Sequence, residues 1–273
     1  MNELSTRNTR LVDTPLGALN LVDEGAGPPI VLVHGVPGTW RDFRHLTPHL
    51  LPWARVIRVD LPGFGGTPVS AGFRHDFAAR AALIRAALDT LGVGPVVALG
   101  QSMGGGTAMA LAADHPDRVR GVVTLCSIGP RRHRGMNQLR PWMFSTLAGA
   151  LRTPGVRDLL LPQLRARWKQ ARMPGGDSMT AADFAFQLHL ASRVDFPGIG
   201  RMVARITRPS LVIWSEDDHL VEAACSVALA DALGTGQRLA FPTGGHNLQK
   251  TRAVEVADAV QQFILTLPTP GAD

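Results

Sequence analysis

A serine stands among glycines in the segment Gly100-Gln101-Ser102-Met103-Gly104, between the apolar run PVVAL and the helix-like TAMALAADHP. A nucleophilic hydroxyl must project from a sheet while its neighbours stay clear, so a sharp strand-to-helix turn with small flanking residues suits it. Amides at the start of the following helix favour developing negative charge, with Met103 N–H as the first donor. Neither a Lys-Ser/Thr pair nor a G-x-G-x-x-G register of phosphate-binding loops is present. We therefore predict that Ser102 is a nucleophile.

Serine is a weak nucleophile at neutral pH and needs a base, which itself needs an orienting carboxylate. The predicted base is His246, on the glycine-rich loop of RLAFPTGGHNLQK between a short strand and the last helix. The acid is expected from the cluster at the end of LVIWSEDDHLV, because the preceding strand GVVTLCSIGP ends without a carboxylate. From the residues alone, the acid can be either Asp217 or Asp218. His219 is a rival base, but a neighbour of the acid on one loop would struggle to reach Ser102.

A second group of glycines follows the apolar strand PPIVLV, in the turn His34-Gly35-Val36-Pro37-Gly38. Glycine permits unusual torsions there and proline stiffens the chain, so a backbone amide can face the site. An acyl tetrahedral intermediate needs two donors at roughly 2.7–3.1 Å, and we expect the second to be the amide of Val36.

A further turn, DLPGFGGT, follows the strand ARVIRVD and should lie at the same carboxyl edge of the sheet. We interpret it as architectural, with Phe64 as a candidate pocket wall.

These turns need a rigid frame, and the sequence predicts one. Short β-branched runs (PPIVLVHG, ARVIRVD, PVVALG, GVVTLCS and SLVIWS) alternate with segments of helical spacing, which predicts an α/β fold with a parallel sheet buried on both faces. Apolar spacing predicts core-facing helices over 77–91 and 254–267. Residues 131–205 lack a convincing strand and contain helix breakers, so we expect a helical insertion there. Its breakers are Pro141, Pro154, Pro162, Pro174 and Pro197.

Composition narrows the function classes. With 273 residues, 45% hydrophobic and 18% charged, the chain suits one globular α/β domain with an insertion. No apolar run approaches bilayer length and MNELSTRNTR lacks a signal-peptide pattern, so we expect no membrane span and a cytoplasmic location. The net charge of +6 comes from scattered arginines, which argues against nucleic acid as a partner. Cys126 and Cys225 lack metal-ligand or CxxC spacing and are expected to be free thiols.

The segments HGVPG, DLPGFGGT, GQSMGGG, WSEDD and GGH together resemble the α/β-hydrolase superfamily, in this order across nearly the whole chain. The resemblance implies an eight-stranded, mostly parallel sheet with helices on both faces and a helical cap after the sixth strand. The core would be residues 1–130 and 206–273 and the cap residues 131–205. The resemblance also implies no cofactor, and we expect no metal.

The resemblance carries the family's nucleophile to Ser102, its base to His246 and its oxyanion amides to Val36 and Met103. It favours Asp218 as the acid, because the family's acid lies three positions beyond the small residue that closes the strand, here Ser215.

Departures from the family pattern bear on the reaction. Members that dehalogenate alkanes or open epoxides use an aspartate nucleophile, which disfavours both chemistries here. Members that hydrolyse C–C bonds in ring-cleavage products usually place a Trp shortly after the catalytic His, whereas Asn247-Leu248-Gln249 follow His246. Haloperoxidase-like members share a similar SMGGG elbow, so perhydrolysis is a side activity to consider.

The expected cap contains RRHRGMNQLRPWMF and QLRARWKQAR, a mixture that could form an apolar acyl pocket with a cationic rim, or a solvated basic face. Trp142, Met143 and Phe144 are the candidate pocket residues. The first functional expectation is a serine hydrolase acting on a carboxylic ester, a small-molecule substrate. The alternatives are a C–C hydrolase of ring-cleavage dienoates and a slow-turnover ligand receptor on the same fold. A homodimer is left open.

Overall fold

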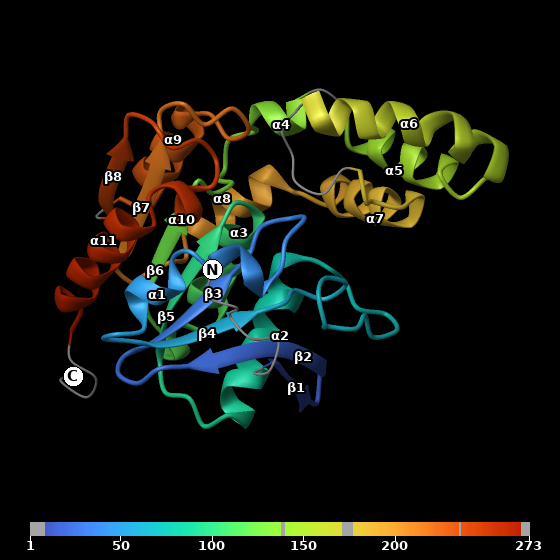
Figure 1. The fold of residues 1–273 in the computed structure, drawn as a ribbon. Coiled ribbons are helices and arrows are strands. Elements are labelled where there is room, and N and C mark those ends of the chain that lie inside the picture. The colour runs from blue at the N-terminus through green and yellow to red at the C-terminus, as the bar shows by residue number, and fades with distance from the viewer. Residues whose placement is uncertain (1–8, 138–139, 171–176, 235, 269–273) are drawn as a thin grey trace. The chain divides into compact units, whose positions relative to one another are not determined.

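The structure is a computed structural model that describes residues 9–137, 140–170, 177–234 and 236–268. One eight-stranded sheet runs through it in the order β1-β2-β4-β3-β5-β6-β7-β8 (Figure 1). The strands are β1 (Thr9–Thr14), β2 (Gly17–Glu24), β3 (Pro29–Val33), β4 (Arg55–Val59), β5 (Val96–Gln101), β6 (Val119–Leu125), β7 (Ser210–Ser215) and β8 (Gln237–Phe241). The β1–β2 and β2–β4 pairs are antiparallel and the other pairs are parallel. The expected α/β class with an eight-stranded, mostly parallel sheet is confirmed.

Helices cover both faces of this sheet. The elements of the core are η2 (Trp40–Phe43), α1 (Thr47–Leu50), α2 (Phe77–Thr90), α3 (Met103–Asp114), η3 (Pro116–Arg118), α8 (Phe196–Val203), α9 (Ala223–Ala232), α10 (Leu248–Thr251) and α11 (Ala253–Leu265). Helices α1 and α11 pack together on one face, while α2 packs against α3 (Figure 1). The continuous apolar strands fit this arrangement, because each strand presents alternate residues to both helical layers.

Strand β5 shows how side-chain size sets the layers. Val97 and Leu99 belong to the core cluster that contains Phe263 of α11. On the other face, a Cβ on Gly100 would lie 2.3 Å from the Gly104 carbonyl oxygen, so only glycine lets α3 approach this strand so closely. The start of α3 is thereby held directly against the end of β5.

Residues 133–195 form a second compact unit, of helices alone within its described residues. Its helices are α4 (Arg134–Asn137), α5 (Pro141–Ala150), α6 (Pro154–Gln170) and α7 (Ala181–Ser192). Leu151, Met179 and Phe184 form a small core of its own, with Trp168 edge-on to Phe184 at 5.4 Å between ring centroids.

The prolines expected to break helices in this region occupy different positions in the helices. Pro141 and Pro154 begin α5 and α6, at the first helical position, where a missing N–H is tolerated. Pro162 was expected to break a helix, but α6 runs through it. Pro174 lies outside the described residues.

The compact helical unit is narrower than the expected insertion, 131–205. Residues 196–205 cluster with the core, because α8 packs against α3. The helix buries Phe196, Ile199, Met202 and Val203, a set with helical spacing that gives it one apolar face. No helix in the described part of the chain is long and apolar enough to cross a membrane.

Candidate active site

Ser102 occupies the sharp turn between β5 and α3, with φ of 54° and ψ of −123°. A non-glycine residue in this left-handed region is strained and persists only where its surroundings hold it. Here its N–H donates to the Leu125 carbonyl at 3.0 Å, and its own carbonyl accepts from the Gly105 amide at 3.0 Å. The turn is thus tied to β6 on one side and to α3 on the other.

The glycines after the serine are required by close backbone contacts. A Cβ on Gly104 would lie 2.2 Å from the Val33 carbonyl oxygen, and one on Gly105 would lie 1.9 Å from Ser127 Oγ. These positions leave no room for a side chain, so the first turn of α3 presses against the ends of β3 and β6.

Asp218 and His246 meet at the same carboxyl edge of the parallel strands. His246 Nδ1 and Asp218 Oδ2 are 2.8 Å apart, and both side chains are buried. The other carboxylate oxygen accepts the amides of Leu220 at 2.9 Å and Val221 at 3.1 Å. Burial raises the pKa of Asp218, but the His246 hydrogen bond and these two amides outweigh it, so the pKa lies below its ordinary value.

The neighbouring Asp217 has a different set of partners. Its exposed carboxylate accepts the amides of Gly244 at 3.0 Å and Gly245 at 2.7 Å, and also the hydroxyl of Ser215. The Ser215 hydrogen bond and these amides hold the pKa of Asp217 below its ordinary value. Asp217 therefore braces the turn before His246, while Asp218 contacts the imidazole itself.

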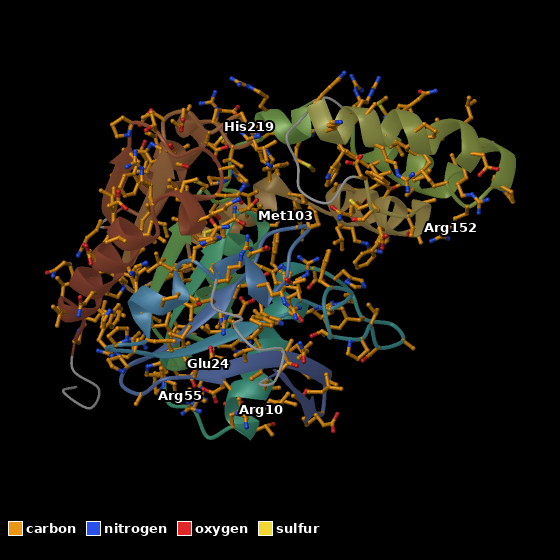
Figure 2. All side chains as sticks on the ribbon, viewed as in Figure 1. Arg10, Glu24, Arg55, Met103, Arg152 and His219 are labelled. Carbon is orange, nitrogen blue, oxygen red and sulfur yellow. The ribbon has the colours of Figure 1, made fainter. Side chains whose placement is uncertain are left out.

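The loop that carries His246 is hydrogen-bonded to the turn that carries Ser102. Gln101 Nε2 donates to the His246 carbonyl at 3.1 Å, and Cys126 Sγ lies 3.6 Å from the Gly245 carbonyl oxygen. Because Gln101 immediately precedes Ser102, these contacts bring the serine turn and the Asp218–His246 pair to one place. Rival His219 lies partly exposed on the loop between β7 and α9 (Figure 2).

The expected oxyanion loop lies beside the serine. A Cβ on Gly35 would be 3.0 Å from Ser102 Cβ, so the chain just before Val36 runs against Ser102. Met103 lies at the start of α3 (Figure 2). Within the described residues, neither the Val36 amide nor the Met103 amide has a hydrogen-bond acceptor. Both N–H groups can therefore donate to a ligand.

The candidate pocket residues fall in both units. Phe64 is half-buried and stands edge-on to His34, with 5.6 Å between ring centroids. Trp142, Met143 and Phe144 lie on α5 of the helical unit, where Trp142 is 63% exposed and Phe144 is buried.

Sequence reasoning assigned no site role to Cys126, which lies at the end of β6 with φ of 45°. Its sulfur lies within 4.8 Å of donor atoms of Asp218 and His246, so these three residues form a potential metal-ligating cluster. Burial and the Asp218 charge raise the pKa of Cys126 well above its ordinary value, and a metal would need the thiolate. We accordingly propose no metal here. Cys126 and Cys225 are both free.

A family model for the α/β-hydrolase fold matches residues 28–253. The chain belongs to the α/β-hydrolase fold family. The 2-hydroxymuconate semialdehyde hydrolase of Pseudomonas sp. strain CF600 is 30% identical over 257 residues, covering 90% of this α/β-hydrolase and 89% of the relative. Haloalkane dehalogenase 2 of Mycobacterium tuberculosis H37Rv is 39% identical over 116 residues, covering 42% of this chain and 40% of that protein.

Solved structures share the architecture of this α/β-hydrolase. A thermophilic esterase from Thermogutta terrifontis has a TM-score of 0.72 at 23% identity, covering 94% of this chain and 98% of that one. The family match and these relatives confirm the resemblance seen in the sequence and make the protein a hydrolase.

Proposed function

We propose that this α/β-hydrolase is a serine hydrolase that works by acyl transfer, with Ser102 as nucleophile, His246 as base and Asp218 as orienting acid. The observation that carries the proposal is the 2.8 Å contact between His246 Nδ1 and Asp218 Oδ2, on a loop fastened beside the Ser102 turn. The ionised acid keeps the proton on Nδ1, so that Nε2 is free to accept the serine proton.

The reaction has two stages, acylation of Ser102 and hydrolysis of the acyl-serine. Ser102 Oγ bonds to the substrate carbonyl carbon while His246 takes its proton, and the Val36 and Met103 amides hold the oxyanion. Collapse of the tetrahedral intermediate breaks the bond between the carbonyl carbon and the leaving group, and His246 gives the serine proton to the leaving group. Water then gives a proton to His246 while its oxygen attacks the carbonyl carbon of the acyl-serine. The bond between that carbon and Ser102 Oγ breaks, His246 returns the proton to Ser102 Oγ, and the carboxylic acid leaves.

For the substrate we favour a carboxylate-bearing ring-cleavage dienoate, hydrolysed at a C–C bond, over the carboxylic ester that was our first expectation. The first support is the Pseudomonas relative, which is named for 2-hydroxymuconate semialdehyde and aligns over most of both chains.

The second support is charge. Residues 133–195 contain eight Arg and one Lys against four Asp, a net charge of +5 out of +6 for the whole chain. A strongly cationic unit attracts an anionic substrate and raises its rate of encounter.

A simple carboxylic ester remains the second candidate. Asn247, Leu248 and Gln249 follow His246, where C–C hydrolases of the family usually carry a Trp, and this departure favours a less specialised acyl group. The two candidates share the acyl-transfer machinery and differ in the leaving group.

The test compares kcat/KM for 2-hydroxymuconate semialdehyde and for p-nitrophenyl esters from acetate to octanoate, using the wild type and Ser102→Ala. We expect the dienoate to be preferred and the variant to lose at least about 10³-fold in kcat with folding intact by circular dichroism. Preference for the esters would replace the first candidate with the second. A wild type inactive on every substrate, or an active Ser102→Ala enzyme, would overturn the acyl-transfer proposal itself.

A further inference from the structure

His34 directly follows β3, is fully buried, and has a protonation pattern that its neighbours determine. The Leu61 amide donates to His34 Nε2 at 2.9 Å. A backbone N–H can only donate, so Nε2 carries no proton and Nδ1 must hold the proton of the neutral ring. His34 Nδ1 therefore donates to the Gly35 carbonyl, 2.6 Å away.

The surroundings keep this ring neutral. Burial lowers the pKa of His34 to about 4, and the positive charge of Arg80 adds to that effect. The Gly35 hydrogen bond and the negative charge of Asp60 oppose it without reversing the direction. At neutral pH the Nδ1–H donor is thus constantly present.

The Gly35 carbonyl shares a peptide plane with the Val36 amide. This peptide is trans, so its C=O and N–H point in opposite directions, and the hydrogen bond that holds one also aims the other. The peptide is confined from two sides. A Cβ on Gly38 would lie 2.7 Å from the Gly35 oxygen, and a Cβ on Gly35 would lie 3.0 Å from Ser102 Cβ.

We propose that His34 is a positioning residue that aims the Val36 N–H at the oxyanion of the acyl intermediate by holding the Gly35 carbonyl. The inference rests on the proposed acyl-transfer function. It assigns His34 no contact with substrate: the ring acts through one rigid peptide plane. Its contribution should therefore appear in the transition state and not in substrate binding.

A pair of near-isosteric variants separates the two hydrogen bonds of the ring. The amide nitrogen of His34→Asn can occupy the place of Nδ1 and keep a donor for Gly35. His34→Gln places its amide near Nε2, where it can accept from Leu61 but leaves the Gly35 carbonyl without its donor. His49→Gln, at an exposed histidine on α1, is the matched surface control.

We expect His34→Gln to lower kcat about 10- to 100-fold with KM nearly unchanged. Removing an oxyanion-hole donor lowers kcat by about 10²–10³-fold, and a misdirected Val36 N–H should lose part of that contribution. His34→Asn should recover at least half of that loss on a logarithmic scale, and His49→Gln should match the wild type. A trifluoromethyl ketone, which forms a tetrahedral adduct with serine, should bind His34→Gln more weakly in proportion to the loss in kcat.

Equal kcat values for His34→Gln and the wild type, or a loss in kcat with no loss of ketone affinity, would overturn the positioning role. If His34→Gln does not fold, Gly38→Ala places a Cβ 2.7 Å from the Gly35 oxygen and 2.8 Å from His34 Nδ1, so it disturbs the same hydrogen bond and should give the same kinetic pattern. Failure of the proposed function is distinguishable, because the wild type itself would then neither hydrolyse the substrates nor bind the ketone.

Discussion

At the scale of single residues, Asp217 and Asp218 show how adjacent carboxylates come to do different work. Both have lowered pKa values, but Asp218 is buried against His246 whereas Asp217 is exposed and bonded to the Gly244–Gly245 turn. Successive residues on a loop point in different directions, so one faces the imidazole and the next supports the chain that carries it.

Their asparagine variants should differ sharply. Asp218→Asn removes the charge that holds Nδ1–H toward the acid, and we expect kcat to fall by about 10⁴-fold. Asp217→Asn keeps an oxygen acceptor for the glycine amides, so kcat should fall by less than about 10-fold. Steady-state kinetics on the preferred substrate measure both. Equal losses in the two variants would mean that the acid is wrongly assigned.

His34 predicts a pH dependence of stability. Its pKa is about 4 in the folded chain against 6.5 for a free side chain, so the unfolded state binds the proton first as the pH falls. The contribution of His34 to the free energy of unfolding is fully present above pH 6.5 and is lost as the pH drops toward 4. At about 1.4 kcal/mol per pH unit, the loss approaches 3 kcal/mol.

Urea unfolding of the wild type and His34→Gln between pH 7.5 and 4 measures this contribution. The wild type should lose more free energy of unfolding across the interval than the variant does. Parallel curves for the two proteins would show that His34 does not titrate differently in the folded state.

At the scale of elements, the turn between β5 and α3 depends on the absence of side chains. Gly100 contacts the backbone of the first turn of α3, which cannot move away without disturbing the helix. The serine in between has left-handed backbone angles that this contact helps to impose. The five-residue pattern is therefore a packing requirement, whatever its part in the proposed reaction.

Gly100→Ala should lower the free energy of unfolding by at least about 2 kcal/mol through overpacking, and should lower kcat by displacing Ser102. Gly94→Ala, before the same strand, is the matched control. A Cβ there meets nothing within 4 Å, so its stability should stay within about 0.5 kcal/mol of the wild type. Urea titrations compare the two; a stable and active Gly100→Ala enzyme would contradict the close contact.

At the scale of the whole molecule, charge divides unevenly between the two units. The core has a net charge of +1 and the helical unit +5. Arg152, an exposed residue of the helical unit, and Arg10, an exposed residue of β1, offer equal charge changes in the two units (Figure 2). The two units can therefore be tested separately for an effect on an anionic substrate.

Raising the ionic strength from 0.02 to 0.5 M should reduce kcat/KM for the dienoate several-fold and leave a neutral ester within about twofold, because salt screens the cationic unit. Arg152→Gln should weaken this salt dependence more than Arg10→Gln does. Initial rates at low substrate concentration give both comparisons. Equal salt effects on the anionic and neutral substrates would remove charge as an argument for the dienoate.

The features that the sequence determined are local ones. The glycines around Ser102 indicate a steric constraint that acts within five residues. The apolar runs that alternate with helical segments indicate a parallel sheet buried on both faces. These signals predict the elbow, the sheet and the order of serine, acid and histidine. The sequence predicted that the insertion ends at residue 205, whereas the compact helical unit ends at residue 195. The two differ because α8 has a helical pattern like that of the insertion, and its partner α3 lies far away in the chain.

The family resemblance favoured Asp218, but only the tertiary structure showed that Asp218, and not Asp217, contacts His246 and that Cys126 lies within 4.8 Å of donor atoms of that pair. It alone showed that the Leu61 amide sets the tautomer of His34, 27 residues earlier. The reason is physical. The direction of a side chain on an irregular loop, and the proton on a buried imidazole, are set by atoms from distant parts of the chain that only folding brings together.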